Sequence, residues 1–267
     1  MIWAPRRELL LPHGRRTGPG GRSRMHGNNV RGPAAGGGGG GDPYFSSVIL
    51  LAYNQNYADG STTVEDQSSA ARTITANGNA QNDTAQAPTG MTSSRLFDGT
   101  GDYDSLADAA AWDFVVSGDF SIEFSIRLAS ASNAFMLGQS NGGGAVAKWM
   151  LVHNWVALNA GHLVMVISPP DLTQIDFGAW SPSLNTWYDM GIFRSGNNWM
   201  AFANGTQVGS TVTSASRPGT SSGTLKLATD GEVQASINGW MGPLRITAGV
   251  CRQTGAYTPP TYPYPTS

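Results

Sequence analysis

The chain has 267 residues, of which 35 are glycine and only 13% are charged, and its formal net charge is −2. This length is compatible with a single all-β domain, and the composition fits many short strands joined by tight turns. The single cysteine, Cys251, excludes an intrachain disulfide and is expected to be a small buried side chain. Because no disulfide is possible, we expect folding in a reducing cytoplasm. No apolar run reaches the ~18–20 residues of a membrane-spanning helix, so we expect no membrane span.

The charge is unevenly distributed along the chain. Residues 1–42 carry seven arginines against Glu8 and Asp42, a net charge of +5 that leaves −7 for the remainder. Residues 1–35 mix Arg, Gly and Pro with few aromatic residues, and six glycines follow at 36–41. Such a segment buries too little apolar surface to offset its ordering entropy. We predict a disordered basic tail and linker over 1–41, which is ordered only on contact with a partner or is simply solvated, ahead of a folded domain over 42–267.

From Asp42 onward the sequence pattern is that of β-strands, and no stretch shows a convincing helical period. Closely spaced strands with turn signals between them predict a sandwich or barrel. The Pro-rich segment after Tyr257 is expected to wrap the domain as extended chain. In chain order, strands are predicted at 47–53, 71–76, 95–97, 103–106, 120–128, 133–138, 148–156, 162–168, 175–180, 187–194, 198–203, 206–210, 223–229 and 238–247.

The cleanest alternation begins at Phe120. One face of this strand carries Phe120, Ile122, Phe124, Ile126 and Leu128, and the other carries Ser121, Glu123, Ser125 and Arg127. A period of two predicts that the first face packs on the core and that the second is wetter.

A three-strand meander spans residues 185–210, with turn signals at 195–198 and at Asn204-Gly205. Its middle strand is apolar on both faces, because Trp199, Ala201 and Ala203 alternate with Met200 and Phe202. We therefore expect this strand to lie inside a sheet that is covered on both sides.

The meander carries the pattern W-Y-x-x-x-x-x-R-S-G-x-x-x-x-x-F-x-N-G-x-x-V-G, which resembles laminin G-like domains of the concanavalin A-like lectin/glucanase group. Segments 42–51, 97–103, 117–128 and 238–265 agree with it, in an order similar to that of modules encoded by tailed bacteriophages. The resemblance covers about 43–267. It implies an all-β, two-sheet antiparallel jelly-roll sandwich and, often, a surface-recognition role. The segment Met241-Gly242-Pro243 departs from the pattern, since relatives commonly have an acidic residue there.

The sequence offers no convincing catalytic group. Glucanases of this fold use alternating acidic residues on one strand, whereas Asp119 and Glu123 are four residues, or ~13 Å, apart. Glycosidase carboxylates are separated by ~5–5.5 Å or ~6.5–9.5 Å. Glu123 is instead expected to pair with Arg127 or a cross-strand partner. His153 and His162 could meet across a hairpin, but no nucleophile lies near them. We expect a protein that is not an enzyme.

Three carboxylates, Asp98, Asp102 and Asp104, cluster around one turn. Ca²⁺ takes carboxylate and carbonyl oxygens, so the cluster is a candidate calcium site. Many laminin G-like relatives hold calcium at the sandwich rim. The alternative is that Asp-Gly simply makes the turn.

Most tryptophans, including Trp199, are expected in the core. Trp155 and Trp180 are predicted at strand ends, beside Asn154 and Asp176. An exposed indole beside amides and carboxylates suits a sugar, whose apolar face stacks while its hydroxyls are hydrogen-bonded. These four residues are the candidate ligand site, with packing as the alternative role.

The resulting hypothesis is a non-enzymatic recognition or decoration module of a phage virion. It is made in the bacterial cytoplasm and displayed on the virion surface, where it binds host-surface glycan. Its N-terminal tail is expected to contact other virion proteins. Two alternatives remain: a purely structural virion appendage without a ligand, and a glycan hydrolase with an unrecognised site. Binding to nucleic acid is not expected.

Overall fold

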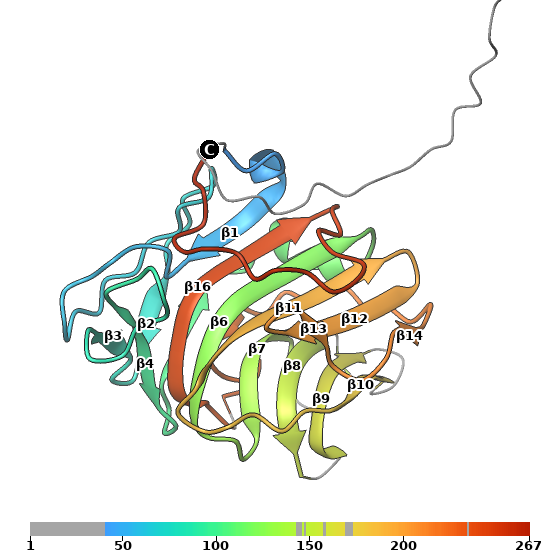
Figure 1. Cartoon of the computed structure of the whole chain (residues 1–267). Helices are drawn as coiled ribbons and strands as arrows, with labels where there is room; N and C mark the ends of the chain where they lie inside the picture. The colour runs from blue at the N-terminus through green and yellow to red at the C-terminus, as the bar shows by residue number, and fades with distance from the viewer. Residues whose placement is uncertain (1–40, 143–145, 147, 157–158, 169–172, 234) are drawn as a thin grey trace, which may run out of the picture. The chain divides into compact units, whose positions relative to one another are not determined.

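The computed structural model describes residues 41–142, 146, 148–156, 159–168, 173–233 and 235–267. The predictions for the basic tail and most of the linker lie outside these residues. The described part is a β-sandwich of two antiparallel sheets, so the predicted fold class is confirmed (Figure 1). Within it, no helix has the length and apolar character needed to cross a membrane.

The first sheet has nine strands. Seven of them follow the order β13-β12-β11-β6-β16-β4-β3, while β1 pairs with β16 and β14 pairs with β12. Its strands are β1 (Val48–Ala52), β3 (Gln81–Asp83), β4 (Ser94–Asp98), β6 (Phe120–Ser130), β11 (Trp187–Ser195), β12 (Asn198–Ala203), β13 (Thr206–Gln207), β14 (Val212–Thr213) and β16 (Asn238–Ala248).

The second sheet has seven strands in the order β10-β9-β8-β7-β15-β5-β2. Two short 3-10 helices, η1 (Phe45–Ser47) and η2 (Ala110–Val115), lie between strands. The sheet consists of β2 (Thr75–Asn77), β5 (Tyr103–Leu106), β7 (Ala134–Ser140), β8 (Lys148–Trp155), β9 (Asn159–Ser168), β10 (Thr173–Ala179) and β15 (Leu225–Leu227).

The main core lies between the two sheets. The apolar face of β6 is buried there, with Phe120, Ile122 and Phe124 fully inaccessible to solvent. Helix η2 adds Phe114, whose ring meets the edges of the Phe120 and Trp149 rings at 5.2 and 5.4 Å between centroids. A six-residue 3-10 helix is too short to display a helical period, which explains why the sequence pattern did not reveal it.

The opposite face of β6 is buried as well, and the expectation that it is wetter is wrong. Ser121, Glu123 and Ser125 are at most 4% exposed. The reason is the chain after β16, which runs as extended segment 249–267 across the outer face of β16, β6 and β11 (Figure 1). The prediction that this Pro-rich segment wraps the domain is confirmed.

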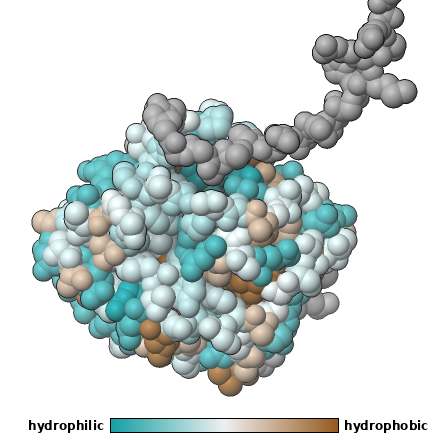
Figure 2. All heavy atoms as spheres, viewed as in Figure 1, coloured by the Kyte–Doolittle hydropathy of each residue, from teal (hydrophilic) through white to brown (hydrophobic). Residues whose placement is uncertain are grey.

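A second apolar layer lies beneath the wrapping segment. Phe193, Met200 and Phe202 are buried on the outer face of the sheet, and Tyr257 and Cys251 pack against them. The middle strand of the meander is therefore covered on both sides, as predicted. Burial raises the pKa of the Cys251 thiol to about 11, which keeps it protonated at neutral pH. The face seen in Figure 2 shows hydrophobic residues only in small, separate groups.

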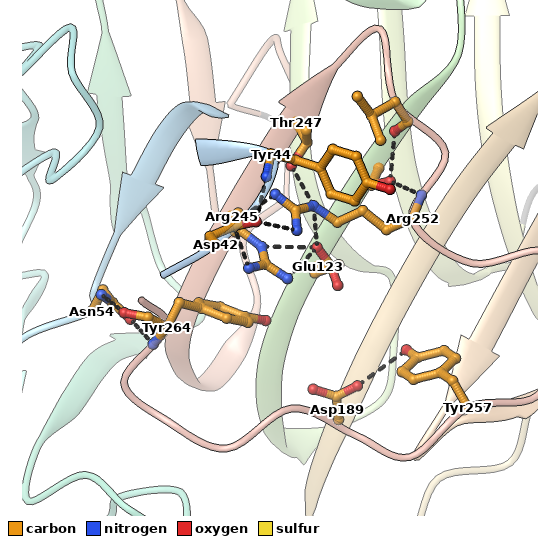
Figure 3. A network of polar contacts seen from close by, with 12 residues as sticks. Asp42, Tyr44, Asn54, Glu123, Asp189, Arg245, Thr247, Arg252, Tyr257 and Tyr264 are labelled. Carbon is orange, nitrogen blue, oxygen red and sulfur yellow. Dashed lines mark hydrogen bonds and ion pairs between the residues drawn. The ribbon is translucent and has the colours of Figure 1, made fainter. Parts of the chain in front are cut away.

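Four charged residues fasten the two ends of the described domain to β6 and β16 (Figure 3). Arg245 contacts Glu123 at 2.8 Å and Asp42 at 3.1 Å. Arg252 contacts Asp42 at 2.7 Å and lies 3.5 Å from Glu123. Because Arg245 is the register partner of Glu123 across β6 and β16, the cross-strand alternative is confirmed. Arg127 instead places its guanidinium over the Trp240 ring, at 4.5 Å.

A further buried carboxylate, Asp189 on β11, receives the hydroxyls of two tyrosines from the wrapping segment. Tyr257 donates at 3.1 Å and Tyr262 at 2.5 Å. Burial raises the pKa of Asp189 to about 6, and the negative charge of Glu123 adds to this effect, although both tyrosine hydrogen bonds oppose it. The folded state therefore holds a proton on Asp189 more tightly than the unfolded chain does.

This raised pKa predicts a specific pH dependence of stability. The contribution of Asp189 is complete below its ordinary pKa of 3.8 and is lost as the pH rises through about 6. The difference in free energy of unfolding between the parent and Asp189→Asn should therefore shift against the parent by about 2.4 kcal/mol between pH 4 and pH 7. Urea unfolding of both proteins across this range measures the shift, and a difference that does not change with pH would contradict it.

Candidate functional site

The candidate site lies on the outer face of β8, β9 and β10, at one edge of the seven-stranded sheet. Along β9, Leu163, Met165 and Ile167 point into the main core. The residues between them on β9, Val164 and Val166, lie on the outer face. They join side chains of β7 and β8 in a separate cluster of buried residues, against which Trp155 packs; the other members are Phe135, Met150 and Val152. Strand alternation thus places a layer of apolar side chains on the outer face of the sheet at this edge.

An irregularity at the end of β8 turns Trp155 toward that outer face. The β8–β9 register shifts between His153 and Trp155, and Asn154 between them has a φ of 54°. The Asn154 side chain fixes this conformation, because it donates to the Ala131 carbonyl at 3.0 Å and accepts from the Gly161 amide at 2.7 Å. A bulge of this kind re-aims the following side chain. Asn154 therefore has a structural role that the sequence analysis did not assign to it.

Trp155 is half-buried, and its ring meets the Phe135 ring edge-on at 5.4 Å between centroids. The next residue, Val156, is 63% exposed, so apolar surface continues outward from the indole. Within the described part of the chain, the indole Nε1 has no hydrogen-bond acceptor. Trp155 therefore combines an anchored ring with an available donor.

A set of linked polar side chains stands beside this ring, on β9 and β10. Asp176 accepts from the His162 Nδ1 at 2.9 Å, from the Asn159 Nδ2 at 2.9 Å and from the Gly178 amide at 2.9 Å. Asn159 also donates to the Gln174 Oε1 at 2.7 Å. Asn159 is the register partner of Trp155, which places these side chains next to the indole.

These contacts fix the polar side chains and leave several of their groups unused. His162 Nε2, Gln174 Nε2 and Asn159 Oδ1 have no hydrogen-bond partner among the described residues. The His162 and Asp176 side chains are 37% and 33% exposed. The site thus presents an indole ring, two donors (Trp155 Nε1 and Gln174 Nε2) and two acceptors. The acceptors are Asn159 Oδ1 and His162 Nε2, because a neutral imidazole that donates through Nδ1 accepts through Nε2. The sequence analysis assigned Asp176 to the ligand site and missed His162 and Gln174, although strand alternation, which places them on the face of Asp176, was a signal in the sequence.

Trp180 does not belong to this surface, and the expectation that it offers an exposed ring is wrong. It is 8% exposed and lies in the main core, where its ring contacts His153 at 4.9 Å and Tyr188 at 5.5 Å. His153 points inward too, with Nε2 bonded to the Trp180 carbonyl at 2.7 Å, and burial lowers the pKa of this histidine. His153 is the register partner of Leu163, so it does not meet His162 across the hairpin.

The predicted calcium ligands do not converge. Asp104 is fully buried and forms a bidentate pair with Arg95, at 2.9 and 2.7 Å, while the Tyr53 hydroxyl donates to it at 2.8 Å. Burial raises the pKa of Asp104, although Arg95 opposes this effect. Asp104 is therefore a structural residue of the core and is not available to a metal ion.

The other two carboxylates make turns. Asp102 accepts from the amides of Asn79 at 2.7 Å and Asp98 at 3.0 Å, and Asp98 accepts from the Thr100 amide at 2.7 Å. Among the described residues, no three carboxylate, histidine or cysteine side chains are grouped so that they could hold a metal ion. The structure thus does not bring Asp98, Asp102 and Asp104 together as one set of ligands: two of them make the turn, and Asp104 forms a core ion pair.

The described fold is similar to those of several solved binding domains. Domain 4 of an extracellular GH43 arabinanase from Geobacillus stearothermophilus, in complex with arabinotriose, is 16% identical with a TM-score of 0.56, covering 80% of this chain and 95% of that one. The binding domain of botulinum neurotoxin DC, in complex with rat synaptotagmin II, is 18% identical with a TM-score of 0.55, covering 76% of this chain. The same neurotoxin domain in complex with SialylT is 19% identical with a TM-score of 0.54.

The match spans about half of the neurotoxin domain, 48% of its length. At these identities the likeness establishes the β-sandwich fold alone, and the resemblance to laminin G-like domains stays a prediction. The sequence matches no protein-family model. It also matches no curated protein.

The opposite positions of the two tryptophans predict different effects of their removal. Trp180→Ala should lower the free energy of unfolding by about 3–5 kcal/mol, as should Trp199→Ala, whose indole is also fully buried. Trp155→Ala, which removes a half-buried ring from the outer face, should cost less than about 2 kcal/mol. Urea unfolding distinguishes them. A Trp155→Ala variant as unstable as Trp180→Ala would show that Trp155 is a core residue.

Proposed function

We propose that the chain is a non-enzymatic carbohydrate-recognition module of a tailed-phage virion, and that the surface around Trp155 binds host-surface glycan. The observation that carries this proposal is the half-buried indole beside the linked side chains of Asn159, His162, Gln174 and Asp176. An aromatic ring with a polar edge next to hydrogen-bonding groups suits a ligand that has one apolar face and many hydroxyls.

The arrangement accounts for both requirements of sugar binding. The indole and the exposed Val156 supply apolar contact. Gln174 Nε2 donates to a hydroxyl oxygen, and Asn159 Oδ1 and His162 Nε2 accept from hydroxyls, since the His162 ring already donates through Nδ1. Because Asp176 holds His162 and Asn159 in place, little side-chain entropy is lost when a ligand binds.

The solved neighbours support the same class of ligand. One was solved with arabinotriose and another with SialylT, and a further neurotoxin structure concerns interaction with two ganglioside molecules. These ligands belong to those proteins, and they make a glycan the first class to test for this chain. The phage context rests on the laminin G-like pattern described above.

The state of the acidic residues supports a role without catalysis. Asp119 accepts from the Gly196 amide at 2.7 Å, and Glu123 is buried against Arg245. Neither carboxylate of the pair considered from the sequence is therefore free to act as an acid or a nucleophile. At the Trp155 surface, Asp176 is the carboxylate, and its oxygens already accept three neighbours.

Glycan-array binding of the full chain tests this proposal. Trp155→Ala is expected to weaken binding about 30-fold, since an aromatic anchor contributes ~2 kcal/mol or more. His162→Ala should weaken it less. Leu184→Ala removes a large hydrophobic side chain that is 48% exposed elsewhere, so it is the matched control and should bind like the parent. Binding unchanged by Trp155→Ala would place recognition elsewhere, and release of reducing ends from a bound polysaccharide would contradict the non-enzymatic role.

A further inference from the structure

A pocket of about 500 Å³ lies where the segment after β1 meets the end of the wrapping segment. Strand β1 belongs to the nine-stranded sheet, whereas Trp155 lies on β8 in the other sheet. One wall comes from residues 54–56 with Gln67, a second from Met91 and a third from residues 263–266. The volume is within the range of pockets that hold small ligands, roughly 300–1,000 Å³. The pocket shares no residue with the surface around Trp155.

The walls are held in place without a ligand. Asn54 donates from its side chain to the Gln67 Oε1 and to the Tyr264 carbonyl, both at 3.0 Å, and accepts from the Tyr264 amide at 2.6 Å. Tyr264 itself is 1% exposed, with the Arg245 guanidinium 4.2 Å above its ring. The residue pair Asn54 and Tyr264 thus ties two walls together, and the pocket exists in the free protein.

The chemistry of the lining is uniform. Every lining residue is uncharged, and four of them are amides. Each of three amide groups has one atom without a hydrogen-bond partner among the described residues: the donors Gln67 Nε2 and Asn56 Nδ2, and the acceptor Gln55 Oε1. Met91 and the two prolines, Pro263 and Pro265, supply the apolar part of the lining.

We infer that this pocket is a second ligand site, which takes a neutral pyranose unit of a glycan. A charged ligand would find no opposite charge in the lining, whereas a pyranose ring offers hydroxyls to the amides and C–H groups to Met91 and the prolines. The inference deepens the proposed glycan-binding function and rests on it for the class of ligand. Two separate sites on one domain would let a polymeric glycan be held at two points, which strengthens attachment through effective concentration.

The test uses two isosteric variants of the full chain, Gln67→Glu and Asn56→Asp. Each retains the oxygen that the fold uses, which accepts from Asn54 in the first case and from the Thr92 amide in the second. Each replaces the unused amide donor with a carboxylate oxygen. Gln81→Glu, on β3 outside the pocket, is the matched control for the change of charge. The probes are methyl α-D-glucopyranoside, methyl β-D-galactopyranoside and methyl N-acetyl-β-D-glucosaminide, measured by ligand-observed NMR titration.

We expect at least one probe to bind the parent. The component of this binding that comes from the pocket should have the same affinity in the parent, in Trp155→Ala and in Gln81→Glu. Gln67→Glu and Asn56→Asp should each weaken this component at least about fivefold, as loss of a hydrogen bond does. Binding that is lost only in Trp155→Ala would overturn the pocket and leave the proposed function standing. Binding that survives in all of these variants would also overturn the pocket. So would the absence of binding of any probe to the parent. In both cases the glycan array tests the proposed function separately.

Discussion

The buried charge network on the outer face of β6 and β16 is the interaction on which the rest of the domain depends. Asp42, Glu123, Arg245 and Arg252 balance two negative charges with two positive ones, away from solvent. Removing one partner would leave a buried charge uncompensated, which costs far more than the pair itself contributes. The network therefore constrains the wrapping segment to one path across the sheet, and this path buries the outer face of β6.

That path also explains what the sequence could and could not reveal. The alternation from Phe120 to Leu128 predicts one buried face correctly, because strand geometry is local. The burial of Ser121 and Glu123 depends on a segment more than a hundred residues later in the chain, and no period in β6 reports it. The same limit applies to Asp104. Its partner Arg95 belongs to a different sheet, so one carboxylate of a turn-like cluster forms a core ion pair that the local sequence does not indicate.

At the candidate site, too, the sequence predicts some features and misses others. The sequence placed Trp155 and Asp176 near strand ends, and the structure connects them through Asn159. The face on which Trp155 lies follows from the left-handed conformation of Asn154, which shifts the alternation by one position. A one-residue shift moves every following side chain to the other face. A register shift also lies near the end of β10, between Asp176 and Gly178, and it places Trp180 on the core side with Phe177. Local composition alone therefore did not distinguish the two tryptophans.

The two proposed sites are held by the same kind of device, in which a side chain used for folding fixes the groups that face a ligand. Asp176 holds His162 and Asn159 on one sheet, and Asn54 holds Gln67 against the wrapping segment. In both places the ordering entropy is lost during folding, so that a weak, polar ligand such as a sugar does not have to offset it. The wrapping segment supplies one wall of the pocket and is itself fixed by Arg252 and by Asp189. The charge network that covers β6 therefore also maintains the shape of the pocket, which links the stability of the fold to recognition.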